Sequence, residues 1–129
     1  MNYGIRLRGD KMIQTVYNIL KPLNIPILYI LRPDISGSSK VGISYHFFNE
    51  SPILYGDGNS KEEGGTVQID VFSTVDFTSV VKQVKDLMKA NKFKFADSWD
   101  SDDSLSNVKY YHKVLIFNYS EKEVMTNGI

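Results

Sequence analysis

Cysteine is absent from this chain of 129 residues, so disulfides, thiolate metal sites and cysteine nucleophiles are excluded. An excess of charge of one sign is also lacking, because 15 lysines and arginines balance 15 aspartates and glutamates. A surface that binds the phosphates of nucleic acid normally carries a basic excess. The apolar runs fall far short of the roughly 20 residues that a membrane-spanning helix needs. Neither direct, sequence-specific nucleic-acid binding nor a membrane partner is therefore expected.

What the chain does contain is enough apolar material for one domain. The hydrophobic share is 42%, and a chain of this length buries about two-thirds of its unfolded surface. We expect a flexible leader over residues 1–11, a single domain over 12–119 and a frayed tail over 120–129. Because the leader has no apolar rhythm, Met12 is an alternative to Met1 as the natural start.

Apolar residues at helical spacing predict two amphipathic helices. The first covers residues 12–20 and ends before Pro22. The second begins at a cap formed by Asp76 or Thr78 and ends at Asn91, in a left-handed conformation. The apolar stripe of each helix is expected to face the core.

Strands are predicted from alternating or wholly apolar runs. They are 27–31, which reads as a buried strand, 41–48, 66–73, a segment starting at Phe93, and 108–119. Residues 100–107 are expected to be a polar connection. Residues 56–65 hold four glycines and no apolar residue, which predicts a mobile loop. The order of these elements predicts an α+β fold, with a mixed or mostly antiparallel sheet of about five strands and two helices packed on it.

Aromatic residues fall on both faces of the predicted strands. Alternation places Phe48, Phe72 and some of Tyr110, Tyr111 and Tyr119 opposite the core. If the helices leave that face open, it is a candidate binding surface, because tyrosine and phenylalanine are enriched at interfaces.

The acidic run of Asp97, Asp100, Asp102 and Asp103 suggests a calcium loop. Such a loop needs a glycine for its sharp turn and a bidentate glutamate near its end, and this run has neither. A solvated hairpin tip is the better interpretation, and no metal is expected here.

The two histidines, His46 and His112, lie on predicted strands and could meet across the sheet. Neither has an aspartate or glutamate at a recognisable spacing, so packed or surface histidines are favoured over a metal or acid–base site. The glycines of 56–65 precede a strand instead of a helix, which excludes both phosphate-binding glycine motifs. We therefore expect no catalytic residues, no cofactor and no enzymatic activity.

A basic face is predicted on the second helix. Residues 82–94 carry five lysines and one aspartate, whereas residues 97–103 carry four aspartates. The basic face is either a solvated helix surface or a docking face for an acidic partner. In the second case, head-to-tail neighbours in a ring could pair the two patches.

Five blocks of sequence carry a resemblance to a known family. They are residues 12–21, 24–29, 45–58, 66–77 and 80–89. Across them, a strand ending in Ile-Asp-Val-Phe-Ser leads through a short turn into an amphipathic helix that ends in a Lys/Asn–Phe step. With these blocks, which span about residues 12–119, the chain resembles the small tail-completion proteins of long-tailed phages and prophages.

The resemblance implies a tail terminator, also called a tail-to-head joining protein, with a small α/β sandwich fold and no catalytic residues. Such proteins form a ring, usually of six subunits, that caps the tail tube, ends its polymerisation and meets the head connector. The implied partners are further copies of the chain, the major tail-tube protein and the head connector, with a monomer allowed before assembly. The implied location is the tail or neck of the virion, and the bacterial cytoplasm during assembly.

Assembly in this family is said to involve mobile loops, and by position alone the matching loop here surrounds residues 57–63. Together with the charged faces, the candidate interface residues are Asp57, Lys61, Glu62, Glu63, Lys82, Lys85, Lys89, Asp100, Asp102 and Asp103. Two alternatives stay open. One is a head-completion or connector protein of the same particle, and the other is a small ligand- or metal-binding module that uses the histidines and the acidic loop.

Overall fold

The helices and strands of the computed structural model follow the predicted order along the chain. The structure describes residues 8–54, 61–101 and 110–125. Its elements are α1 (Arg8–Leu20), the short 3-10 helix η1 (Lys21–Leu23), β1 (Ile27–Tyr29), β2 (Val41–Leu54), β3 (Lys61–Ser73), α2 (Thr78–Ala90), β4 (Lys94–Asp100), β5 (Tyr111–Ser120) and α3 (Glu121–Met125).

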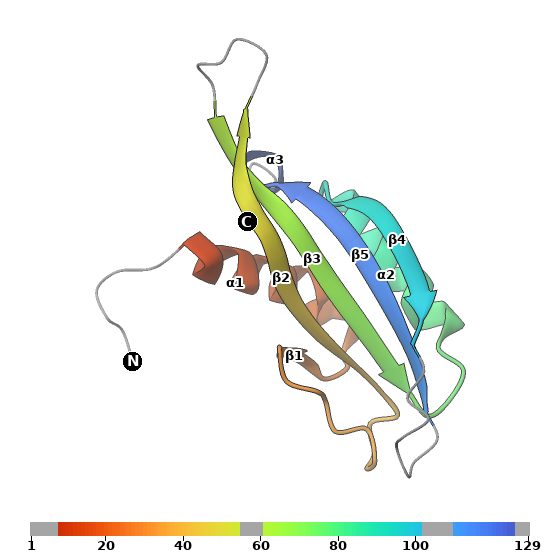
Figure 1. The fold of residues 1–129 in the computed structure, drawn as a ribbon. Coiled ribbons are helices and arrows are strands. Elements are labelled where there is room, and N and C mark those ends of the chain that lie inside the picture. Colours follow the sequence, from red (N-terminus) through yellow and green to blue (C-terminus); the bar gives the residue numbers. More distant parts are fainter. Residues whose placement is uncertain (1–7, 55–60, 102–109, 126–129) are drawn as a thin grey trace, which may run out of the picture.

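The strands form one mixed sheet of five, in the order β1-β2-β3-β5-β4. β1 runs parallel to β2, and the other neighbours are antiparallel. Helices α1 and α2 cover the same face of the sheet (Figure 1). The predicted α+β fold, a single small domain with a mixed sheet and helices packed on it, is confirmed.

The core lies between this face and the helices, because apolar side chains alternate along the strands and recur every three or four residues along the helices. Its fully buried apolar side chains include Met12, Val16, Leu20, Ile43, Val67, Ile69, Val71, Val84, Met88, Leu115, Phe117 and Val124.

Both ends of the described chain are more ordered than predicted. Helix α1 begins at Arg8, four residues before the predicted start at Met12. Met12 is fully buried, and the preceding helical turn brings it onto the sheet. Residues 121–125 form α3 where a frayed tail was expected, and the buried side chain of Val124 anchors this helix in the core.

The hairpin of β2 and β3 extends beyond its predicted length. Residues 61–65, expected in the loop, belong to β3, while residues 55–60 lie outside the described residues. Residues 61–65 were predicted as loop because they include no apolar side chain, but backbone pairing in a strand does not require one. Gly64 and Gly65, for example, pair with β5 in the antiparallel ladder. A register shift between Phe48 and Ser51 accompanies the extension of β2.

Two turns and one helix cap differ from their predicted form. The strand expected over 27–31 ends at Tyr29, because Ile30 adopts a left-handed backbone conformation with a φ of 71°. After α2 the left-handed residue is Lys92, with a φ of 73°, instead of Asn91. The N-cap position of α2 is Phe77, which makes no side-chain cap hydrogen bond, instead of Asp76 or Thr78. Asp76, one residue earlier, accepts hydrogen bonds from the backbone N–H and the hydroxyl of Thr78, which lowers the pKa of Asp76.

Tyr45 ties β2 to α1 and makes stability sensitive to alkaline pH. Its hydroxyl donates a hydrogen bond to the carbonyl of Ile13 over 2.7 Å, and burial raises its pKa from 10.0 to about 12. Between these two pH values the phenolate forms more readily in the unfolded chain, so Tyr45 stabilises the fold below pH 10 and loses this contribution as pH rises towards 12.

We therefore expect Tyr45→Phe to lower the free energy of unfolding by about 1 kcal/mol at neutral pH. The difference between variant and wild type should then shrink above pH 10. Urea titrations at several pH values measure both effects. If the free energy of unfolding fell by the same amount in the variant and the wild type up to pH 12, this would contradict the role of Tyr45.

Candidate functional site

The sheet face opposite the helices, called the open face below, carries aromatic, polar and charged side chains. Phe48 and Phe72 lie on it, as predicted, with exposed fractions of 36% and 4%. Of the three tyrosines of which some were expected there, Tyr110 lies beside Phe72, with 6.1 Å between ring centres, and the other two do not lie on this face. Tyr119 is buried in the core, and the ring of Tyr111 stacks on Phe77 at the start of α2, because odd-numbered residues of β5 face the helices.

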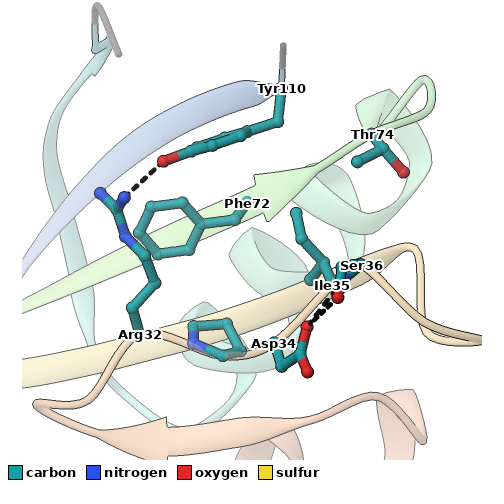
Figure 2. Close-up of a pocket in the computed structure, with 8 residues that line it drawn as sticks. Arg32, Asp34, Ile35, Ser36, Phe72, Thr74 and Tyr110 are labelled. Atoms are coloured by element: carbon teal, nitrogen blue, oxygen red, sulfur yellow. Dashed lines mark hydrogen bonds between the residues drawn. The ribbon is translucent and has the colours of Figure 1, made fainter. Parts of the chain in front are cut away.

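Residues 31–40 cross one end of the open face and cover part of it. Pro33 is buried directly over Gly42, where an added Cβ would lie 2.7 Å from the proline ring. The guanidinium of Arg32 lies 4.5 Å from the centre of the Phe72 ring and donates a hydrogen bond to the hydroxyl of Tyr110 (Figure 2). These contacts fix the segment on the sheet and explain why Phe72 is buried on a face without helices.

A pocket of about 190 Å³ lies between this segment and the ends of β3 and β5. It is lined by Arg32, Pro33, Asp34, Ile35, Ser36, Phe72, Thr74 and Tyr110. Its walls are mainly apolar, and the carboxylate of Asp34 is engaged by the N–H and hydroxyl of Ser36, which lowers the pKa of Asp34. The pocket therefore suits an apolar group better than a polar one.

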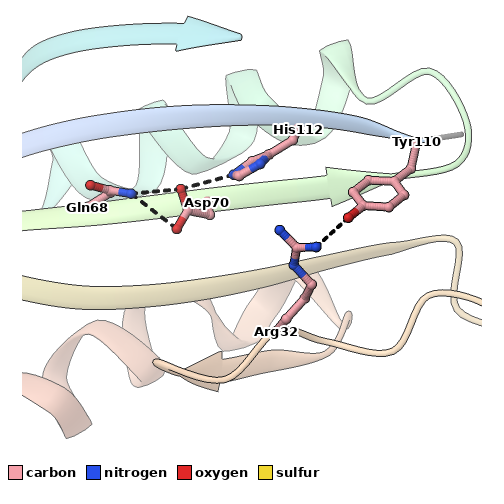
Figure 3. A network of polar contacts seen from close by, with 5 residues as sticks. All are labelled: Arg32, Gln68, Asp70, Tyr110 and His112. Carbon is pink, nitrogen blue, oxygen red and sulfur yellow. Dashed lines mark hydrogen bonds and ion pairs between the residues drawn. The ribbon is translucent and has the colours of Figure 1, made fainter. Parts of the chain in front are cut away.

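A polar cluster occupies the middle of the open face (Figure 3). The amide of Gln68 donates to both carboxylate oxygens of Asp70, over 3.0 and 3.3 Å. Nε2 of His112 lies 3.2 Å from Oδ1 of the same carboxylate, and the His112 ring stacks on Phe72 with 4.2 Å between ring centres. The cluster satisfies polar groups on a largely covered surface and fixes the His112 ring in one orientation.

The Asp70–His112 contact was not predicted, because neither histidine has an acidic residue at a recognisable spacing in the sequence. It arises from the pairing of β3 with β5, where Phe72 lies opposite His112 and Asp70 lies one side-chain step further along the same face. The two histidines do not meet, since His46 lies opposite Gln68 on the other side of β3. Within the described ranges, no three histidine, aspartate or glutamate side chains are grouped to hold a metal ion.

Two of the three predicted interface residues on α2 lie near one aromatic ring of β4. The ammonium groups of Lys85 and Lys89 lie 4.7 and 5.9 Å from the centre of the Phe95 ring. Lys82 forms an exposed ion pair with Asp86 over 2.8 Å. The lysine face therefore lies at the β4 edge of the sheet.

The predicted interface aspartate that the structure describes, Asp100, lies at the same edge of the sheet. Asp100 ends β4 and contacts the ammonium of Lys113 over 3.1 Å. Asp57, Asp102 and Asp103 lie outside the described residues. Lys61, Glu62 and Glu63 do not lie in a loop, because they pair with Leu54, Ile53 and Pro52 in the hairpin.

Exposed apolar side chains at both sheet edges were not predicted. Ile30 and Leu31 follow β1 and are 62% and 67% exposed, although the sequence placed them in a buried strand. Trp99, on the opposite edge strand β4, is 47% exposed. The left-handed backbone of Ile30 interrupts the apolar run, and the amino-acid composition of the run does not predict this conformation.

Comparisons with known proteins place few constraints on this chain. No family model and no curated protein matches it. A solved structure with some likeness is the sheath/tube terminator of an extracellular contractile injection system, PVC, in the extended state, with a TM-score of 0.38 and 11% identity. The match covers 93% of this chain and 58% of that one, so the chain spans little more than half the length of its structural neighbour. No helix within the described ranges combines the length and the apolar character needed to cross a membrane.

Proposed function

We propose that this protein is a structural assembly protein of a phage or prophage tail. It caps the tail tube as a ring, ends the polymerisation of the tube and joins it to the head connector. The resemblance of its sequence blocks to tail-completion proteins supports this proposal. It acts through shape and surface contacts, without catalysis and without a cofactor.

The observation that carries the proposal is the pair of exposed apolar sites at opposite sheet edges. Ile30 and Leu31 lie at one edge and Trp99 lies at the other. Contiguous apolar side chains, such as Ile30 with Leu31, and exposed tryptophans, such as Trp99, are enriched at surfaces that contact other proteins. A subunit in a ring needs two different contact surfaces, one for each neighbour. Two edges on one rigid sheet meet this need.

Purified protein mixed with tail tubes provides the test. We expect negative-stain images to show a ring at one tube end, and added tube protein should no longer lengthen such tubes. A monomer in the absence of tubes is compatible with the proposal. Tubes that stay uncapped at micromolar protein and keep growing would contradict it, and binding to the head connector alone would indicate a head-completion role.

A further inference from the structure

Strand β4 is the longer of the two edge strands of the sheet (Figure 1). Within the residues that the structure describes, its one partner in the sheet is β5. An edge strand presents unpaired backbone N–H and C=O groups that can pair with a further strand. The charges of Lys94 and Asp97, and the register shift between Phe95 and Asp97, restrict which chains can pair here. A partner must therefore match the charges of this edge.

Two half-exposed aromatic rings lie on opposite sides of β4. Trp99 lies opposite Val114 on the open face and is 47% exposed, whereas Phe95 lies opposite Phe117 on the helix side and is 39% exposed. A strand added about 4.7–4.9 Å away would bring its own side chains against both rings. Because aromatic residues are enriched at protein interfaces, these rings favour a protein partner.

Charges of both signs lie along this edge, and the described carboxylates on its helix side already have partners. Asp86 of α2 contacts the ammonium of Lys82 over 2.8 Å. Asp100 of β4 contacts the ammonium of Lys113 over 3.1 Å. Each pair neutralises its own carboxylate, so the remaining lysines on this side determine which charge a partner must carry.

Lys85 and Lys89 form no ion pair within the described part of the chain. Their ammonium groups lie 4.7 and 5.9 Å from the centre of the Phe95 ring. The pKa of Asp86 is lowered first by its hydrogen bond from Lys82 and to a smaller extent by the charge of Lys89, so Asp86 is engaged mainly by Lys82. Two ammonium groups at one half-exposed ring therefore suit a carboxylate that approaches along the edge.

We infer that the β4 edge binds an extended, acidic segment of a partner protein as an additional strand of the sheet. The backbone of this segment pairs with that of β4, and a carboxylate beside Phe95 contacts Lys85 and Lys89. The inference rests on the proposed function only in taking the β4 edge as a surface that contacts another protein. It adds the conformation and the charge of the segment that this surface takes.

A nucleic acid fits this edge less well than a peptide does. Asp97 is exposed on the open-face side of β4, where it repels a chain that carries a phosphate at every step. A peptide can place a carboxylate beside Phe95 and an uncharged side chain beside Asp97. The nucleic-acid backbone also has no N–H groups to donate to the carbonyls of an edge strand.

A synthetic peptide tests the inference in solution, without tubes. The probe is as long as β4 and alternates threonine with glutamate. The fluorescence of Trp99, the single tryptophan of the chain, reports whether the edge is occupied. We expect saturable binding that shifts the emission to shorter wavelength. The same peptide with lysine in place of glutamate should bind about tenfold more weakly.

A double variant and a matched control separate the charges at Phe95 from the net charge. Lys85→Gln/Lys89→Gln should weaken binding of the glutamate peptide about tenfold at an unchanged melting temperature, because glutamine has a similar helix propensity. Lys21→Gln/Lys40→Gln makes the same change in net charge at exposed positions outside α2 and β4. This control should bind the peptide as the wild type does.

Several outcomes would overturn the inference. They are equal binding of the peptide by Lys85→Gln/Lys89→Gln and the wild type, equal binding of an N-methylated glutamate peptide, which has no backbone N–H donors, and binding of a double-stranded oligonucleotide in place of the peptide. A protein that caps tubes but ignores the peptide at millimolar concentration would overturn the inference alone. A protein that binds the peptide but does not cap tubes would instead overturn the proposed function and leave the peptide site.

Discussion

Replacing Val84 by aspartate should unfold the protein or leave it only marginally stable. Val84 is fully buried on the inner face of α2, within the core between the helices and the sheet. The substitution loses the apolar burial of valine, worth about 1.5–3 kcal/mol. It also buries a carboxylate that has no partner there, which costs about 3–5 kcal/mol more. Natural domains have only about 5–15 kcal/mol of stability in total.

Circular dichroism during heating and in urea measures this loss. Gln83→Asp introduces the same side chain at the adjacent, exposed position of α2 and should cost no more than about 0.5–1 kcal/mol in helix propensity. Val84→Ala separates lost packing from the buried charge and should be intermediate. A Val84→Asp protein that melts at the wild-type temperature would show that this side of α2 does not face the core.

The position of Val84 could be predicted because helix and strand periodicity is a local property of the sequence. Val84 recurs with Val81 and Met88 at helical spacing, and Ile69 alternates with polar neighbours in β3. These patterns determine which side of each element is apolar, and so they predicted the layers of the fold. They do not determine how strands pair.

The features that escaped prediction depend on contacts between distant residues or on unusual backbone geometry. Asp70 and His112 are 42 positions apart and meet only through the β3–β5 register. Ile30 is a β-branched residue in an apolar run, which favours a strand, yet its backbone turns and exposes it. Tertiary contacts of the neighbouring segment, such as those of Arg32, decide such geometry.

The candidate interface was only partly accessible from sequence. The charged patches around Lys85 and Asp100 could be recognised as candidates, and their role in assembly stays a prediction. Their shared location at the β4 edge could not be recognised, because it depends on the packing of α2 against β4, which brings Lys85 and Lys89 to the Phe95 ring. That location changes which surface of a neighbouring copy each patch can meet.

The close packing of Pro33 on Gly42 leads to the second large effect expected. In Gly42→Ala the new Cβ would lie 2.7 Å from both Cβ and Cγ of Pro33, too close for either to stay in place. The sheet holds the backbone of Gly42, and the contacts of Arg32 hold the backbone next to Pro33, so neither can move away easily. We therefore expect a loss of about 1–3 kcal/mol in the free energy of unfolding. Gly37→Ala is the matched control, with no atom within 4 Å of the added Cβ.

The two substitutions should shift stability in opposite directions. Gly37 lies outside the left-handed region, so an alanine there restricts the unfolded chain and should stabilise the protein by about 0.4–1 kcal/mol. Gly42→Ala should also raise the protein concentration needed for capping tubes, because displacing Pro33 shifts Leu31, two residues earlier in the chain, at the β1 edge. Urea unfolding and the tube assay measure the two effects separately. Equal stability changes in both variants would mean that Gly42 does not hold the segment, whereas destabilisation with unchanged capping would mean that the position of Leu31 does not govern assembly.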